Sequence, residues 1–243
     1  MRRPTSLFFL LAAPLLAQTS SSQPEYQAAR KSDEITVDGR LSEFTWSLAG
    51  QVGRFQSIRP HPGTPRLATQ AMLAWDDRNL YVAFVCADPQ PWGTMMERDQ
   101  HLWDEEVVEV FLDPDGDGRD YPELEVSPHN VVVDLLIPAP GEITADEAAK
   151  WDIAGLQTAV GKHAAGWTVE MSIPWNALAE SGTDQAPAIG DKWRVGLYRI
   201  ERPGGPTPDR DDSQDQFQAW APTEKSFHEP HRFGSVEFVL QPR

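Results

Sequence analysis

The sequence is poor in cysteine and in basic residues, and no stretch of it is long and apolar enough to cross a membrane. Its single cysteine, Cys86, excludes a disulfide within the chain. With 21 Lys and Arg against 37 Asp and Glu, the formal net charge is −16, so nucleic acid and anionic membrane surfaces are poor partners. Phosphate-binding loops, nucleophile elbows and His/Cys metal motifs are also missing, and the sequence therefore gives little support for an enzyme.

The first residues have the form of an export signal. Two arginines precede the apolar run 7–16, which ends next to the small residue Ala17. We therefore expect residues 1–17 to be a signal peptide that directs the protein to the periplasm or the extracellular space. The polar residues 18–32 show no apolar periodicity and are predicted to form a flexible leader, followed by one domain over residues 33–243.

Short strand-like runs separated by Gly, Pro, Asn and Asp dominate the rest of the chain. Their number and the size of the chain predict an all-β fold, a single antiparallel β-sandwich of jelly-roll or Greek-key type. One or two short helices are expected, over 144–150 behind Thr144 and over 174–180 behind Pro174. The expected strands cover residues 34–38, 67–76, 80–87, 107–113, 123–127, 131–137, 156–162, 166–173, 193–201 and 235–240.

The segment 103–121 carries most of the chemical signal. Twelve acids and two bases lie between Glu97 and Glu125, so this stretch favours a cation or the hydroxyl donors of a sugar as its partner. Within it, Glu109 alternates with apolar residues on one face of a strand. A carboxylate in that position must find a donor or a ligand.

An Asp/Gly loop follows this strand and could hold a cation. Asp113, Asp115, Asp117 and Asp120 can turn several oxygens toward one centre, as calcium requires. Leu124 occupies the twelfth position, where an EF-hand needs a bidentate Glu, so a calcium site here would be of another type. The alternative is a solvated turn rich in Asp and Gly.

Six strings, in order along the chain, resemble carbohydrate-binding module family 9 and its relatives among the DOMON-like β-sandwiches. The resemblance implies an antiparallel β-sandwich with bound calcium and a slot that holds a sugar end between two aromatic rings. The strings lie at residues 35–46, 74–84, 103–111, 167–175, 198–201 and 233–234.

The resemblance also implies residues for the slot. Trp103 matches the first stacking aromatic, Phe227 is the candidate for the second, and Glu109 matches a carboxylate that hydrogen-bonds sugar hydroxyls. The strand after the Asp/Gly loop has Glu123 and Glu125 where sugar-binding members have an arginine, and Glu125 belongs to the expected sugar-binding set. Arg199 completes this set. The alternative for Glu109 is a structural ion pair with Arg194 or Arg199.

The sequence thus predicts a non-catalytic, exported carbohydrate-binding module that assists glycoside hydrolases in trans. Two alternatives stay open. Related sandwiches bind b-type haem, for which Met95, Met96 and His101 lie in one segment. A glycoside hydrolase would instead use Glu109 and Glu125 as its carboxylates.

Overall fold

The computed structural model describes residues 23–59 and 61–242, so the expected signal peptide lies outside the described residues. Twelve strands form one curled sheet. Their bounds are Glu25–Arg30 (β1), Gln56–Arg59 (β2), Thr69–Trp75 (β3), Asn79–Ala87 (β4), Val107–Asp113 (β5), Tyr121–Val126 (β6), Val132–Ile137 (β7), Gln157–His163 (β8), Gly166–Pro174 (β9), Lys192–Glu201 (β10), Gln216–Ala219 (β11) and Gly234–Val239 (β12).

Helical segments are short and lie between the strands. The α-helices are α1 (Phe44–Ala49) and α2 (Ala145–Ala148), and Thr144 caps α2 in a capping box with Glu147, as the sequence predicts. The expected helix over 174–180 is a pair of 3₁₀ turns. The 3₁₀ turns are η1 (Leu102–Asp104), η2 (Trp175–Ala177), η3 (Ala179–Ser181), η4 (Asp212–Gln214) and η5 (Pro230–Arg232).

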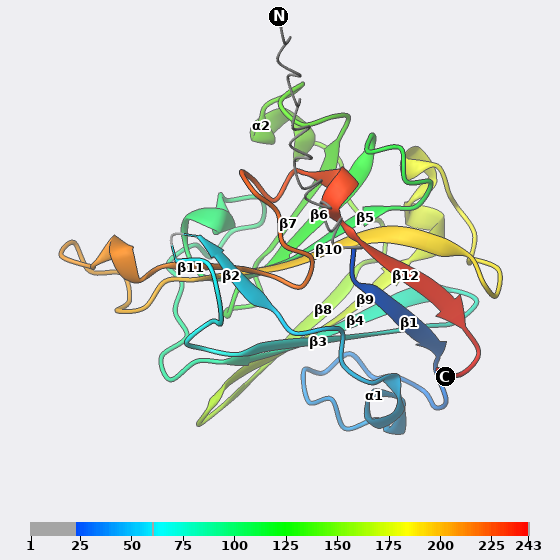
Figure 1. Ribbon diagram of the computed structural model, residues 1–243, viewed down its shortest axis with the longest axis horizontal. Helices are drawn as coiled ribbons and strands as arrows, with labels where there is room; N and C mark the ends of the chain where they lie inside the picture. Colours follow the sequence, from blue (N-terminus) through cyan, green and yellow to red (C-terminus); the bar gives the residue numbers. More distant parts are fainter. Residues whose placement is uncertain (1–22, 60, 243) are drawn as a thin grey trace, which may run out of the picture.

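The strand order along the sheet is β7-β6-β5-β10-β12-β1-β3-β4-β9-β8, and β11 joins β10 to β2. The sheet curls so that β5, β6, β7 and β10 form one layer and β3, β4, β8 and β9 the other, as Figure 1 shows. This architecture confirms the all-β sandwich. The pairings of β1 with β12 and with β3 are parallel, whereas the sequence predicted antiparallel pairing throughout.

The main core lies between the two layers. Alternate residues of β5 and β10, such as Val110 and Leu197, meet residues of the opposite layer, such as Phe84 and Met171, in one buried cluster. The other face of β5 and β10 carries a second cluster that includes Phe111 and Tyr198. Because both faces of β5 are buried, five of its seven residues are apolar; Glu109 lies on the second face, and Asp113 ends the strand.

Of the ten strands expected from the sequence, all but one are present. The exception is 34–38, which is irregular and leads toward α1. The strands that the sequence analysis missed are β1, β2 and β11, which have six residues or fewer. Their segments are rich in Gln, Arg, Ala and Glu, and only pairing with longer strands makes them extended.

The prediction of a flexible leader over 18–32 is wrong for its second part. Residues 25–30 form β1, which pairs with β12 and β3 inside the sheet. The Tyr26 side chain is buried, and its hydroxyl accepts a hydrogen bond from the backbone N–H of Leu73 at 3.2 Å. Ala28 and Ala29 are also buried, because small side chains fit the closely packed centre of the curled sheet.

In the described parts of the chain, no helix is long and apolar enough to cross a membrane.

Candidate functional site

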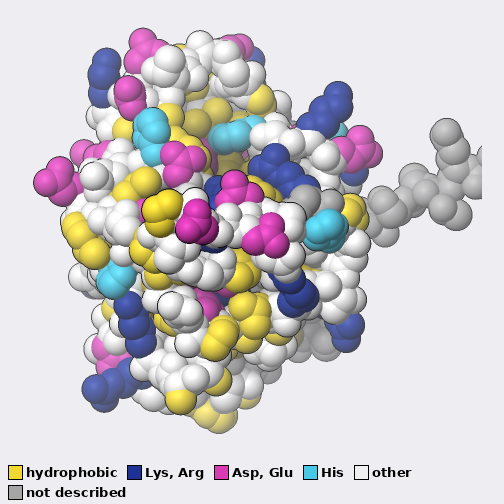
Figure 2. Space-filling view, turned by 90° about the vertical axis from the view of Figure 1, so that its left-hand side faces the viewer, with side chains coloured by type: hydrophobic (Ala, Val, Ile, Leu, Met, Phe, Trp, Pro, Cys, Tyr) yellow, Lys and Arg dark blue, Asp and Glu magenta, His cyan; other side chains and the backbone are white. Residues whose placement is uncertain are grey.

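A cavity of about 710 Å³ opens over the second face of β5, β6, β7 and β10. Strands supply its floor, and its walls come from η1, the segment 139–145, the loop 226–228 and the short strands β2 and β11. Figure 2 shows acidic, basic and histidine side chains gathered around a hollow on one face of the molecule, with hydrophobic side chains in its depth. The segments that form the cavity are therefore far apart in sequence and are brought together by the sheet.

Three glutamates form the floor of this cavity. Glu109 on β5 lies directly opposite Glu125 on β6, and Glu123 is two residues away on the same face of β6. Their exposed fractions are 1%, 0% and 4%, and one oxygen of each lies within 4.8 Å of the others. As carboxylates, both oxygens of Glu125, Oε1 of Glu109 and Oε2 of Glu123 have no hydrogen-bond donor among the described residues, and only protonation allows a hydrogen bond between Glu123 and Glu125. The floor is thus an unsatisfied acidic cluster, which we call the glutamate floor.

Burial and mutual repulsion favour the protonated forms of these carboxyl groups. Burial raises the pKa of Glu109 well above its ordinary value, and the neighbouring Glu123 raises it further. Burial likewise raises the pKa of Glu123 to about 8. For Glu125, burial is again the main cause, followed by repulsion from Glu109 and Glu123. Near neutral pH the glutamate floor therefore retains protons unless a positive group replaces them.

Trp103 lines the cavity from η1, as the sequence predicts. Its backbone carbonyl accepts a hydrogen bond from Arg202 at 2.8 Å, and Arg202 is itself anchored to Asp215 at 2.6 Å. The ring of His101 stacks on the indole with a centroid distance of 4.4 Å. These contacts hold the half-buried indole in place and leave it in contact with the cavity.

Phe227 lines the same cavity, so both expected aromatic residues reach one site. The side chain of Phe227 is buried, because its ring stacks on that of Tyr198 with a centroid distance of 4.1 Å and an interplanar angle of 14°. Arg59 lies above two rings of this wall, 4.1 Å from Phe217 and 5.7 Å from Phe227. The wall thus presents ring surface together with the donors of one guanidinium.

Sequence reasoning missed Arg59, Arg202 and Phe217 as lining residues. Arg59 and Phe217 belong to the two short strands that the sequence did not reveal. Arg202 directly follows β10, so only its position next to an expected strand could have indicated it. The carboxylate pattern in β6 was visible, and the structure confirms that Glu123 and Glu125 face the same side.

His228 forms part of the wall beside the glutamate floor. Its Nδ1 lies 3.0 Å from the hydroxyl of Tyr121, and its Nε2 lies 3.7 Å from Oε2 of Glu123. Burial lowers the pKa of His228, so the ring is neutral at physiological pH and forms no ion pair with Glu123.

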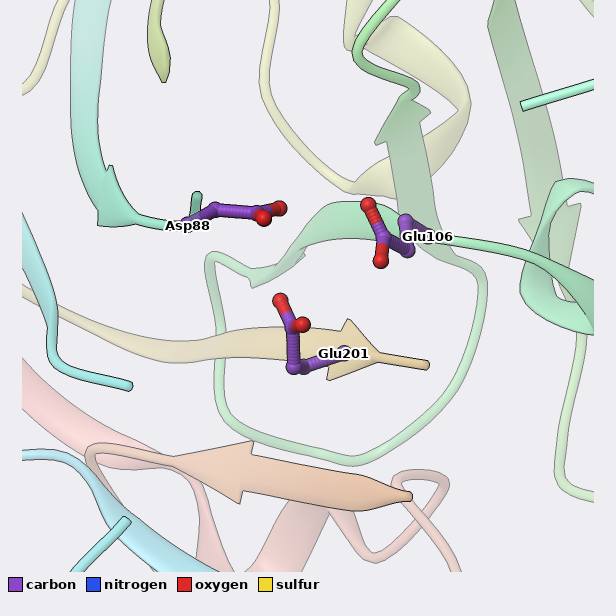
Figure 3. Close-up of side chains that lie close together, drawn as sticks. All are labelled: Asp88, Glu106 and Glu201. Atoms are coloured by element: carbon purple, nitrogen blue, oxygen red, sulfur yellow. The ribbon is translucent and has the colours of Figure 1, made fainter. Parts of the chain in front are cut away.

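The expectation that Arg199 contacts the ligand is wrong. Arg199 alternates with Tyr198 on β10 and points to the opposite face, between the layers, where it is fully buried. It pairs there with Asp88 at 3.3 Å and with Glu201, and it does not pair with Glu109. Figure 3 shows Asp88 and Glu201 pointing toward Glu106 in this second acidic group. Arg199 is thus a structural charge that compensates buried acids.

The Asp/Gly loop between β5 and β6 brings three of its four expected ligands together. Asp113, Asp115 and Asp117 have one oxygen each within 4.8 Å of the others, whereas Asp120 is not part of this group. The carboxylate of Asp113 accepts hydrogen bonds from the backbone of Gly116 at 3.1 Å and Gly118 at 3.2 Å. Asp115 and Asp117 are exposed, so the loop has the donor chemistry of a calcium site with one buried anchor.

The three residues considered as haem ligands lie in different surroundings. His101 stacks on Trp103, and its Nε2 lies 3.2 Å from Asp146. Met95 packs against the second cluster, while Met96 is exposed. No axial pair is formed by these three described residues.

The fold and the cavity define the protein as an all-β ligand-binding domain. Residues 37–241 match the family described as carbohydrate family 9 binding domain-like, and the chain belongs to this family. No curated protein matches the chain.

Solved structures share the fold at low sequence identity. One is a family 9 carbohydrate-binding module from Caldicellulosiruptor kristjanssonii in complex with cellotriose, with 18% identity, a TM-score of 0.62, and coverage of 90% of this chain and 95% of that chain. A structure of a family 9 module from the same organism with glucose gives 17% identity, a TM-score of 0.60, and coverage of 90% and 97%. A candidate carbohydrate-binding protein from Bacteroides uniformis gives 15% identity, a TM-score of 0.65, and coverage of 89% and 100%.

Proposed function

We propose that the protein is an exported, non-catalytic carbohydrate-binding module that holds a sugar or a polysaccharide end in the cavity above the glutamate floor. The observation that carries this proposal is the joint lining of one cavity by Trp103, Phe227 and three buried carboxyl groups. Membership of the family and the sugar complexes of similar structures support it.

The physical basis of recognition is the two-sided character of a sugar ring. The C–H face of a pyranose packs on aromatic surface, which Trp103 and Phe227 provide. Its hydroxyl groups need hydrogen-bond acceptors and donors, which Glu109 and Arg59 provide. The lining therefore suits a flat ligand with a polar edge.

The geometry of the glutamates favours binding over hydrolysis. In glycoside hydrolases the two carboxyl groups flank the scissile bond, about 5–9.5 Å apart. Here Glu109 and Glu125 lie side by side on one floor, with oxygens less than 4.8 Å apart. This side-by-side arrangement supports a binding role rather than hydrolysis.

Export follows from the signal-like residues 1–17, and it would place the module where polysaccharides occur, in the periplasm or outside the cell. There it would present or retain substrate for glycoside hydrolases acting in trans. We also propose that calcium binds the Asp/Gly loop through Asp113, Asp115 and Asp117 and stabilises it.

A glycan array with neutral, acidic and amino sugars, read with and without EDTA, tests the proposed function. Binding of at least one class of glycan is expected, with loss in Trp103→Ala. Failure of the folded protein to bind any glycan would overturn the proposal.

A further inference from the structure

The glutamate floor contains more carboxyl groups than the binding of a neutral sugar requires. One carboxylate is enough to orient a hydroxyl group, yet Glu109, Glu123 and Glu125 converge on one point with four oxygens that, as carboxylate oxygens, lack a hydrogen-bond donor among the described residues. A buried polar group without a hydrogen-bond partner destabilises the folded state. The floor therefore has the features of a binding site for a partner that donates several hydrogen bonds at once.

The positive groups that face the cavity do not satisfy these carboxyls. Arg202 is held by Asp215 and by the carbonyl groups of Trp103 and Glu105. The Arg59 guanidinium lies over the aromatic wall, and its charge partly offsets the rise in the pKa of Glu109, but it is not within ion-pair distance of any described acid. The neutral ring of His228 approaches Glu123 only to 3.7 Å.

Additional acids surround the same cavity. Asp104 from η1, Asp212 from η4 and Asp215, which directly precedes β11, also line it. Arg202 and Arg210 pair with Asp215, and Arg210 also pairs with Asp212. The lining carboxyl groups without an Arg or Lys ion pair among the described residues are therefore the three glutamates and Asp104, and Arg59 is the lining guanidinium without an ion pair there. The electrostatic surroundings favour a positive ligand.

The glutamates lie close enough together for one ammonium group to contact all three. A charge-assisted N–H···O bond is about 2.8 Å long, so three acceptors arranged tetrahedrally around one nitrogen lie about 4.6 Å apart. The ligand oxygens of the three glutamates lie within 4.8 Å of one another. An ammonium group donates three hydrogen bonds and has no acceptor, which is the complement of this floor.

A bare cation would use only a small part of the cavity. The space of about 710 Å³ and its aromatic wall suit a ring that carries the positive group rather than an ion alone. Protonation of the carboxyls reduces the charge of the empty floor, and an ammonium group can take the place of those protons.

We propose that the glutamate floor recognises a protonated amine on the sugar, so that the ligand class is an amino sugar with a free amino group. This inference rests on the proposed function and specifies its ligand. The amine lies on the floor between Glu109, Glu123 and Glu125, while the sugar ring packs against the wall that contains Phe227.

Calorimetry of the full chain with glucose, glucosamine and N-acetylglucosamine, and with their short β-1,4 oligomers, tests the inference at neutral pH. N-acetylation removes the positive charge and keeps the nitrogen. The comparison of glucosamine with N-acetylglucosamine therefore tests whether binding needs the charged amine. We expect the free-amine ligands to bind at least tenfold more tightly than both neutral series. Glu125→Gln and Glu123→Gln should remove this preference, so that glucosamine no longer binds more tightly than glucose to the same variant, while Glu180→Gln, at an exposed site outside the cavity, should keep it.

Equal affinity for glucose and glucosamine in the wild type would overturn the inference and leave the proposed function standing. A preference for the amine that survives in both floor variants would also overturn it. If calcium alone saturates a site that is lost in Glu125→Gln, the floor is a metal site and not an amine site. Absence of binding by every sugar would overturn the inference together with the proposed function.

Discussion

Glu109 and Glu125 lie directly opposite each other on neighbouring antiparallel strands, and both side chains are buried. Like charges in that position destabilise a sheet, so the pair costs folding free energy in the absence of a partner. The pair stabilises the folded protein only when a ligand or a proton is bound to it. This relationship links the stability of the protein to pH and to its ligand.

The stability of the protein should fall as the pH rises from about 4.5 toward 8. Glu123 has its folded-state pKa raised to about 8 from the ordinary value of 4.5, so the folded state binds more protons than the unfolded state in this window. Protonated Glu123 contributes its full stabilisation below the unfolded-state pKa of 4.5, and this stabilisation is lost as the pH rises through the folded-state pKa of about 8. Glu109 and Glu125 act in the same direction.

Glu123→Gln should therefore melt at a higher temperature than the wild type at pH 8, and the gap should shrink toward pH 5. The free-energy difference at pH 8 should be on the order of a few kcal/mol. Thermal melts of both proteins across this range measure it, with Glu180→Gln as the exposed control. A difference in melting temperature that does not vary with pH would contradict the raised pKa of Glu123.

Trp103→Ala should weaken sugar binding by about 1–3 kcal/mol, because the indole supplies stacking surface to the cavity. Calorimetry with the best glycan of the array measures the loss. Phe44→Ala is the matched control, since Phe44 is exposed on α1 and does not line this cavity. Equal affinity of wild type and Trp103→Ala, both folded, would place the ligand elsewhere.

Removal of β1 should destabilise the whole sandwich. A truncation that starts at Ser32 deletes the strand between β12 and β3 and the buried ring of Tyr26, so we expect it to fail to fold. The milder Tyr26→Phe loses the hydrogen bond to Leu73 and should cost about 1–2 kcal/mol in urea denaturation. Glu25→Ala, at an exposed position of the same strand, should change stability little. A truncated protein with an unchanged melting temperature would show that β1 is dispensable.

Calcium should raise the melting temperature through the Asp/Gly loop. Binding to the folded state alone stabilises by about 3–4 kcal/mol when calcium exceeds its dissociation constant by a hundred- to a thousandfold. Asp115→Asn should reduce this gain, whereas Asp120→Asn should retain most of it because Asp120 lies outside the cluster. Identical melts in EDTA and in millimolar calcium would refute the site.

The sequence by itself determined where the long strands lie and which acidic residues share one side of a strand. A nearly continuous apolar run located β5, and the two-residue spacing of Glu123 and Glu125 put both on one side of β6. These features are local, because a strand fixes the side of each residue whatever it pairs with. The aromatic candidates Trp103 and Phe227 came from the family resemblance, and the structure places both at the same cavity.

The tertiary structure decided what local patterns do not encode. The sequence shows that Arg199 lies on a strand but not which face becomes the interior, and the pairing of β10 with β5 turns it away from the cavity toward Asp88 and Glu201. Strand β1 exists only because β12 and β3, more than forty residues away in sequence, supply its hydrogen bonds. The convergence of Glu109 with Glu125 likewise depends on the register between β5 and β6. Register is set by which side chains the whole sheet buries, so it is a property of the folded molecule and not of either strand.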